Sequence, residues 1–411
     1  MMREESSWEL QSAKTYPTLS QNIEADIVII GAGLVGIFNA YILSKAGLKV
    51  VVLESKKEIL HSTTLVTTAF ITKIIDSSYE ELITLFGKEN ARLIWQSGQD
   101  AIDCIADIIE NENIDCEFKF VKVFTYAKDY KQFTKLTKEY EAIKESGIEA
   151  ALWKDGSSLH FKNSGFMEIS DQATFHPLKF GYALADLAES AGAKIFTDSE
   201  VLSIENLTVK IKDYQVQATD ILLATHYPFI NKGTQFKKSL YVSYVYELEI
   251  AKGLIREGLY LDMDNPYHYF KIDSFENFDR MIMGGEDHRK DIKINPSKNF
   301  RALEEYIQLI LGENDYKITR KWDGPIIESV DGLPLIGDIK PHMFEVTALS
   351  GSGMTYAAVS ALIIRDLILK KNNPYIDLYS IKRTTTLRQY IIKGYNYVQE
   401  FFGGAFKNFF K

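Results

Sequence analysis

Hydrophobic positions near the N-terminus predict a strand, a helix and a second strand in close succession. Residues 25–30 (ADIVII) form a β-branched apolar run that is typical of a buried parallel strand. Residues 34–46 predict a helix that ends at Gly47, because a glycine readily adopts the left-handed conformation found after a helix. The apolar run 49–53 (KVVVL), which is followed by Glu54, completes a βαβ unit.

The remaining pattern predicts an α+β region and then a return to the βα arrangement. Residues 241–287 are rich in Tyr, Phe, Ile and Met with period-two stretches, which indicates an antiparallel sheet. Helices are expected over 76–112, 129–146, 177–191, 299–312 and 354–369, and strands over 117–127, 194–196, around 200–225 and 344–349. We therefore expect two discontinuous domains after an irregular lead-in.

Composition is that of a globular protein and excludes several classes. The 411 residues are 46% hydrophobic and 25% charged, with a formal net charge of −9, which argues against a general nucleic-acid binder. Cys104 and Cys116 form no CxxC pair, so neither a zinc site nor a thioredoxin-like motif is expected, and no metal ligand set is predicted. No apolar run has the length of a signal peptide or a transmembrane helix, so we expect a cytoplasmic protein.

The strongest motif is Gly31-Ala32-Gly33-Leu34-Val35-Gly36, which follows the first strand and opens the first helix. Its glycines would allow a tight turn, the approach of backbone to a pyrophosphate and close packing of helix on strand. The helix N-terminus offers free N–H groups to phosphates. Glu54 stands at the position that binds ribose hydroxyls and would repel a 2′-phosphate, which disfavours NADP.

Two later segments favour FAD over NAD. Residues 221–225 (ILLAT) predict a strand that ends in Ala224 and Thr225, as often seen where flavoproteins return to the cofactor. A second glycine-rich turn, 350–354 (SGSGM), precedes the last helix and would place N–H donors near the electron-rich edge of a reduced flavin.

Several motifs in order resemble the D-amino acid oxidase-like superfamily of FAD-dependent oxidoreductases, which includes glycine oxidase and sarcosine oxidase. The resemblance is strongest to the branch that often carries a Rieske domain and to gamma-glutamylputrescine oxidase. The motifs are Trp8, the glycine fingerprint, 63–69 (TTLVTTA), 175–179 (FHPLK), 284–288 (GGEDH) and 331–334 (DGLP).

This resemblance implies an α/β fold with a Rossmann-like FAD-binding domain of the GR2 type and an interleaved α+β substrate domain on an antiparallel sheet. We assign residues 1–75, 156–235 and 321–380 to the FAD-binding domain and 76–155 and 236–320 to the substrate domain. The residues expected at the cofactor are Gly31, Gly33, Leu34, Val35, Gly36, Glu54, Ser55, Thr63, Thr67, Thr68, Ala69, Val201, Ala224, Thr225, Gly337, Gly351, Ser352, Gly353, Met354 and Thr355.

The chain departs from its relatives at informative positions. Relatives often have Gly at position 65, Lys at 70 and Arg at 271, where this chain has Leu65, Phe70 and Lys271. Lys keeps the charge of Arg but loses the fork geometry that suits a carboxylate. No Cys-His set for an iron–sulfur cluster is present, and no cysteine stands in the C-terminal region to tether the flavin, so we expect non-covalent FAD.

The activity implied by the resemblance is oxidation of a C–N bond in a small amine or amino acid, with hydride transfer to flavin N5 and hydrolysis of the imine. The candidate pocket residues are Phe70, Tyr244, Tyr269, Lys271 and His288. Structural interpretations stay open as well: the two tyrosines could pack the sheet, and Lys271 could be a solvated charge. Glu328 and Trp322 could also line the pocket, but the sequence supports this only weakly. His176, before Pro177, is expected to cap a helix.

Other partners and functions remain open from the sequence. Oxygen, a quinone or a carrier protein could reoxidise the flavin, and the chain could form a homo-oligomer. Residues 381–411 predict a basic amphipathic helix that packs on its own domain or a second subunit, or else contacts the inner membrane surface. The alternative functions are a non-catalytic or electron-transfer flavoprotein and an FAD enzyme acting on a macromolecule.

Overall fold

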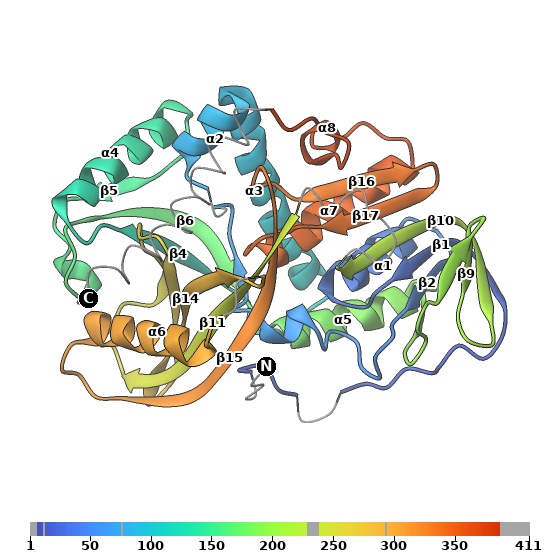
Figure 1. Ribbon diagram of the computed structural model, residues 1–411, viewed down its shortest axis with the longest axis horizontal. Coiled ribbons are helices and arrows are strands. Elements are labelled where there is room, and N and C mark those ends of the chain that lie inside the picture. The colour runs from blue at the N-terminus through green and yellow to red at the C-terminus, as the bar shows by residue number, and fades with distance from the viewer. Residues whose placement is uncertain (1–5, 11–12, 75–76, 228–237, 292–293, 387–411) are drawn as a thin grey trace.

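Two sheets organise the protein in the computed structural model, which describes residues 6–10, 13–74, 77–227, 238–291 and 294–386. The sheets lie side by side in Figure 1, with the mainly antiparallel sheet on the left and the mainly parallel sheet on the right. This arrangement confirms the predicted α/β fold with a second part built on an antiparallel sheet.

The parallel sheet contains the predicted βαβ unit. Its main path runs β16 (Leu335–Lys340), β17 (Met343–Thr347), β10 (Gln215–His226), β1 (Ile23–Ile30), β2 (Val50–Leu53) and β7 (Lys194–Phe196). β16 runs antiparallel to β17, and the short strands β8 (Ser203–Glu205) and β9 (Thr208–Lys210) attach antiparallel beside β10. Ile27, Val28, Ile29 and Ile30 of β1 are buried, as the apolar run 25–30 predicts.

Three helices cover the parallel sheet and share its core. They are α1 (Leu34–Lys45), α5 (Pro177–Ser190) and α7 (Gly353–Ile368), and α1 packs against both of the others. Ile27 and Ile29 of β1 lie in one cluster with Ile37 and Phe38 of α1. His176 caps α5 by accepting a hydrogen bond from the Lys179 N–H, as predicted.

The second sheet runs in the order β15 (Tyr316–Ser329), β11 (Lys238–Ala251), β14 (Phe278–Arg289), β13 (His268–Ser274), β12 (Gly258–Leu261), β4 (Lys119–Tyr126), β6 (Phe166–Thr174) and β3 (Phe70–Ile71), with β5 (Ala151–Trp153) paired to β6. All these pairs are antiparallel except β12 with β4. Helix α6 (Pro296–Leu311) packs on β14 and β11, and α4 (Tyr130–Glu145) packs on β4, β5 and β6. Helix α2 (Tyr79–Phe86) packs against α4 and α3 (Lys88–Asn111), and α3 also packs against α7 of the parallel-sheet half.

Several predicted boundaries need correction. The single helix expected over 76–112 is two helices, because Gly87 adopts φ +83° and breaks the repeat between α2 and α3. Strand β6 was not expected, and it pairs in the second sheet although our boundaries put 156–235 in the FAD-binding domain. The same holds for β3 and for the last part of β15, which fall in the ranges 1–75 and 321–380.

The C-terminal helix predicted over 381–411 lies mostly outside the described residues, and the described part, 381–386, forms a turn rather than a helix. This turn is fixed to the parallel-sheet half by Arg383. The guanidinium donates to both carboxylate oxygens of Asp331, at 2.7 and 2.6 Å, and to the carbonyls of Leu333 and Pro334. Within the described part of the chain, no helix combines the length and hydrophobicity needed to cross a membrane.

We expect Arg383→Leu to lower the free energy of unfolding by about 3 kcal/mol, because it leaves the buried carboxylate of Asp331 without its cation. Burial favours the neutral acid, but the hydrogen bonds and charge of Arg383 outweigh it and lower the pKa of Asp331. The contribution should therefore be present above about pH 4 and disappear as the carboxyl is protonated in more acidic solution.

Chemical denaturation at pH 7 and at pH 3 measures this dependence. The matched control is Lys382→Leu, because Lys382 pairs with Asp338 at the surface and should contribute less than about 1 kcal/mol. Equal losses for the two variants at pH 7 would contradict the assignment.

Candidate active site

A large cavity lies where the two sheets meet. Its volume is about 2410 Å³, whereas pockets for one small ligand usually measure roughly 300–1,000 Å³. One wall consists of the carboxyl ends of β1, β2, β10 and β17 with the turns that follow them, and the other of strands β11, β13, β14 and β15. The cavity therefore has room for a dinucleotide cofactor and a second molecule.

The three fingerprint glycines differ in what a side chain at each position would contact. A Cβ on Gly36 would stand 1.9 Å from the Gly31 carbonyl oxygen, so only glycine lets α1 approach β1 this closely. Gly31 has φ +105°, and a Cβ there would lie 2.6 Å from the Ala224 carbonyl oxygen. A Cβ on Gly33, by contrast, would meet no atom closer than 3.7 Å. The space beside Gly33 is therefore open to a ligand, as a pyrophosphate site requires.

Glu54 is held in place at the end of β2 by the fingerprint loop itself. Its Oε2 accepts a hydrogen bond of 2.8 Å from the Ala32 N–H, and its Oε1 accepts one of 3.0 Å from the Lys56 N–H. The carboxylate lines the cavity, in the position expected to receive ribose hydroxyls.

Most residues expected at the cofactor line this one cavity. They are Gly31, Gly33, Leu34, Val35, Glu54, Ser55, Thr63, Thr67, Thr68, Val201, Ala224, Thr225, Gly351, Ser352, Gly353 and Met354. The exceptions are Gly36, Ala69, Gly337 and Thr355, which do not line it. Thr355 has a structural task instead, since its hydroxyl bonds both the N–H and the carbonyl of Thr72.

The antiparallel-sheet side of the cavity carries three of the five predicted pocket residues: Phe70, Tyr269 and His288. The rings of Phe70 and Tyr269 meet edge to face at 5.7 Å, and the Tyr269 hydroxyl lies 3.2 Å from the Ser243 hydroxyl. Burial lowers the pKa of His288 below its ordinary value, so the imidazole is neutral at pH 7. Its Nδ1 lies 3.4 Å from the Tyr244 hydroxyl.

Tyr244 and Lys271 do not line the cavity. Tyr244 is buried in the sheet-and-helix core, with its ring stacked on His288 and set edge to face against Phe300. Its hydroxyl supports His288 from behind, and burial raises the pKa of this hydroxyl to about 12.

Lys271 is a buried structural cation and not a solvated charge. Its Nζ lies 3.0 Å from Asp273 Oδ2 and 3.2 Å from the Thr174 hydroxyl, and 4.8 Å from the centre of the Trp8 ring. Burial lowers the pKa of Lys271, while Asp273 opposes this shift. The sequence placed Lys271 on the same strand face as Tyr269, but it could not reveal that Trp8 packs over it.

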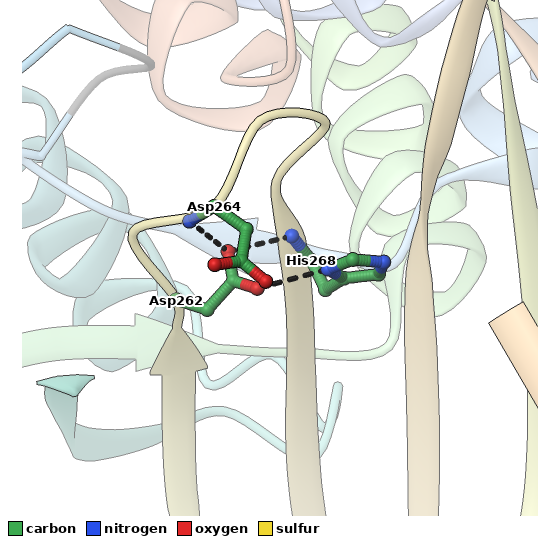
Figure 2. Close-up of side chains that lie close together, drawn as sticks. All are labelled: Asp262, Asp264 and His268. Atoms are coloured by element: carbon green, nitrogen blue, oxygen red, sulfur yellow. Dashed lines mark hydrogen bonds and ion pairs between the residues drawn. The ribbon is translucent and has the colours of Figure 1, made fainter. Parts of the chain in front are cut away.

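A cluster of Asp262, Asp264 and His268 stands at the edge of the cavity, with its potential ligand atoms within 4.8 Å of one another (Figure 2). These atoms are already bonded within the protein: Asp262 Oδ2 accepts from His268 Nδ1 at 2.8 Å, and the Lys128 ammonium pairs with Asp264. The cluster is therefore a network of ion pairs within the protein.

The charge of His268 follows from its neighbours. Burial disfavours the imidazolium, but hydrogen bonds to Asp262 and Glu286 outweigh burial and raise the pKa of His268 to about 9. His268 is consequently positive at pH 7, and this charge, with that of Lys128, opposes the binding of a metal cation.

One of the cavity residues that the sequence did not single out is a buried histidine. His226 follows Thr225 at the end of β10, with φ +62°, and burial lowers its pKa to about 4. In the sequence, the only signal for His226 was its position directly after the predicted strand 221–225. Glu328, which had only a weak signal, also lines the cavity, whereas Trp322 does not.

A glycine cradle at the carboxyl edge of a parallel sheet, open to a cavity shared with an antiparallel sheet, defines a dinucleotide-binding protein of two interleaved parts. The chain belongs to the DAO family of FAD-dependent oxidoreductases, whose family model matches residues 26–367. This confirms the resemblance found in the sequence, and FAD as the cofactor.

Relatives of known sequence support the same family. YhfW of Bacillus subtilis, described as a Rieske 2Fe-2S iron-sulfur protein, is 30% identical over 382 residues, which are 90% of this chain and 73% of YhfW. The gamma-glutamylputrescine oxidoreductase of Escherichia coli is 21% identical over 396 residues, which are 90% of each chain.

Solved structures share the fold. Glycine oxidase from Geobacillus kaustophilus superimposes with a TM-score of 0.74 at 16% identity, over 89% of this chain and 100% of the oxidase. L-proline dehydrogenase from P. horikoshii superimposes with a TM-score of 0.72 at 19% identity, over 92% and 99% of the two chains.

Two glycine substitutions should separate folding from cofactor binding. Gly33→Ala should change the unfolding free energy of the apoprotein by less than about 1 kcal/mol, because its Cβ meets no close atom. The same methyl group should raise the Kd for FAD at least roughly tenfold, because it enters the space kept for the pyrophosphate.

Gly36→Ala should instead destabilise the apoprotein itself, by about 2 kcal/mol or more, because its Cβ collides with the Gly31 carbonyl. Thermal unfolding of both apoproteins and titration with FAD measure these effects. Unchanged FAD affinity in Gly33→Ala would place the pyrophosphate elsewhere.

Proposed function

We propose that the protein oxidises a C–N bond of a small amine or amino acid. The observation that supports this most directly is the large cavity, which joins the glycine cradle to an aromatic wall and a neutral histidine. FAD supplies the acceptor for a hydride when it is bound. The reaction also requires that the amine is bound, oriented and unprotonated, and the side chains of the protein must provide these three conditions.

The aromatic wall suits the carbon part of an amine. Phe70 stands on β3, beside the 63–69 loop, and its ring is braced by Tyr269. An apolar surface excludes water from the reacting carbon and lowers the stability of a charged ammonium. The Tyr269 hydroxyl, held by Ser243, offers a hydrogen bond to a polar group of the substrate.

His288 can take the proton that an ammonium must lose before its carbon gives up a hydride. The imidazole lines the cavity, is neutral at pH 7, and contacts the Tyr244 hydroxyl through Nδ1. An orienting partner on one ring nitrogen leaves the other for proton transfer. The implied role of Lys271 in binding a substrate carboxylate has no support from its buried position, so an amine without a carboxylate fits equally well.

The direct test is anaerobic mixing of the purified holoprotein with a panel of primary and secondary amines and amino acids. We expect loss of the oxidised flavin absorbance with one chemical class and release of the corresponding aldehyde, keto acid or imine. A flavin that dithionite reduces but no member of the panel bleaches would contradict the proposal and favour a non-catalytic or electron-transfer flavoprotein.

The role of His288 predicts a pH profile. The rate of flavin reduction by substrate should fall in acidic solution, as the pH drops through the lowered pKa of His288 and the imidazole becomes protonated. His288→Asn should lower the rate by about 10²-fold or more and abolish this acidic limb. His342→Asn is the control, because His342 lies at the surface beside Asp220 and not in the cavity. An unchanged profile in His288→Asn would refute the assignment.

A further inference from the structure

The loop that joins the two sheets at the cavity is held by two indole N–H groups. The Trp322 Nε1–H donates to the carbonyl of Val66 at 2.9 Å, and the Trp8 Nε1–H donates to the carbonyl of Thr67 at 2.6 Å. These are consecutive peptides of the loop that follows the short helix η1 (Thr63–Val66). Val66, Thr67 and Thr68 all line the cavity, whereas neither tryptophan does.

Each indole bond fixes the plane of one peptide. In a trans peptide the carbonyl and the following N–H point in opposite directions, so a carbonyl turned toward an indole turns the next N–H away from it. The two bonds therefore direct the N–H groups of Thr67 and Thr68 to the side opposite the tryptophans. No described residue accepts a hydrogen bond from the Thr68 N–H.

The two tryptophans are themselves immobilised, by different parts of the molecule. Trp322 belongs to β15 and is 1% exposed, and the same strand approaches the loop so closely that a Cβ on Gly324 would lie 3.2 Å from Val66. Trp8 belongs to the lead-in segment, is also 1% exposed, and lies against the cations of Lys271 and Arg280.

The surroundings of Trp8 include three charged side chains, Lys271, Asp273 and Arg280, that do not line the cavity. Asp273 pairs with Lys271 at 3.0 Å and with Arg280 at 2.9 Å, and so holds both cations beside the indole at ring distances of 4.8 and 5.3 Å. Cations attract the face of an indole ring, most strongly when water is excluded. A segment that belongs to neither sheet is thereby fixed against the loop.

We propose that Trp8 and Trp322 are positioning residues that orient the Val66–Thr67 and Thr67–Thr68 peptides as hydrogen-bond donors to the flavin ring. Both indole donors are far from the loop in sequence: Trp8 precedes its acceptor Thr67 by 59 residues, and Trp322 follows its acceptor Val66 by 256 residues. The inference rests on FAD binding and is independent of the proposed amine chemistry. Donors fixed before the cofactor binds stabilise the more electron-rich, reduced ring.

The test compares Trp8→Phe and Trp322→Phe in the full-length protein. Phenylalanine keeps most of the apolar contact and removes the N–H donor. We expect the Kd for FAD, measured by titration of the apoprotein, to rise about threefold to tenfold in each variant. We also expect a shifted flavin absorption spectrum and a lower midpoint reduction potential, which loss of stability alone would not produce.

Tyr379→Phe is the matched control, because it removes a buried 2.7 Å hydrogen bond to Ser97, and neither of these residues lines the cavity. It should lower the unfolding temperature and leave the FAD affinity, spectrum and potential unchanged.

If Trp322→Phe fails to fold, Trp8→Phe decides, since Trp8 lies outside both sheets. Tryptophan variants with a reduced unfolding temperature but the spectrum, potential and Kd of the unsubstituted protein would overturn the proposal. All three readouts can be measured whether or not any amine is oxidised.

Discussion

The contact between Gly36 of α1 and the Gly31 carbonyl is the constraint on which the cofactor half depends. The two atoms can approach only because no Cβ intervenes, and this approach sets the height of α1 above β1. The position of α1 in turn determines where its free N–H groups face, where α5 and α7 pack, and how the loop after β2 reaches the cavity. The absence of one side-chain atom at Gly36 thus determines the geometry of an entire layer.

Sequence reasoning predicted well those features that local patterns determine. The βαβ unit needs only an alternation of apolar runs and a glycine turn, and the His176 cap needs only a helix start. The helices α4, α6 and α7 appear in the structure within a few residues of their expected limits. Gly87 is the counterexample, because its conformation interrupts an apolar repeat that is otherwise continuous across α2 and α3.

Features that depend on distant residues could not be predicted in this way. Lys271 follows Tyr269 by two residues along β13, so the period of a strand places both side chains on the same face. What separates their roles is Trp8, more than 260 residues earlier, which covers Lys271, whereas Tyr269 stays open to the cavity. Strand β6 was missed for a similar reason: its polar residues Glu168 and Gln172 are buried by tertiary hydrogen bonds, which hide the expected alternation.

The interleaving of the sheets has a consequence for how this protein can diversify. The chain passes from the parallel sheet to the antiparallel sheet and back twice, contributing β3 to β6 on one visit and β11 to β15 on the next. The antiparallel-sheet half is therefore not one continuous segment that recombination could exchange in a single step. New specificity would have to arise by substitutions made in place, on strands whose opposite face is already committed to a core. Such a scaffold preserves its cofactor geometry while the cavity wall formed by the antiparallel sheet changes one residue at a time.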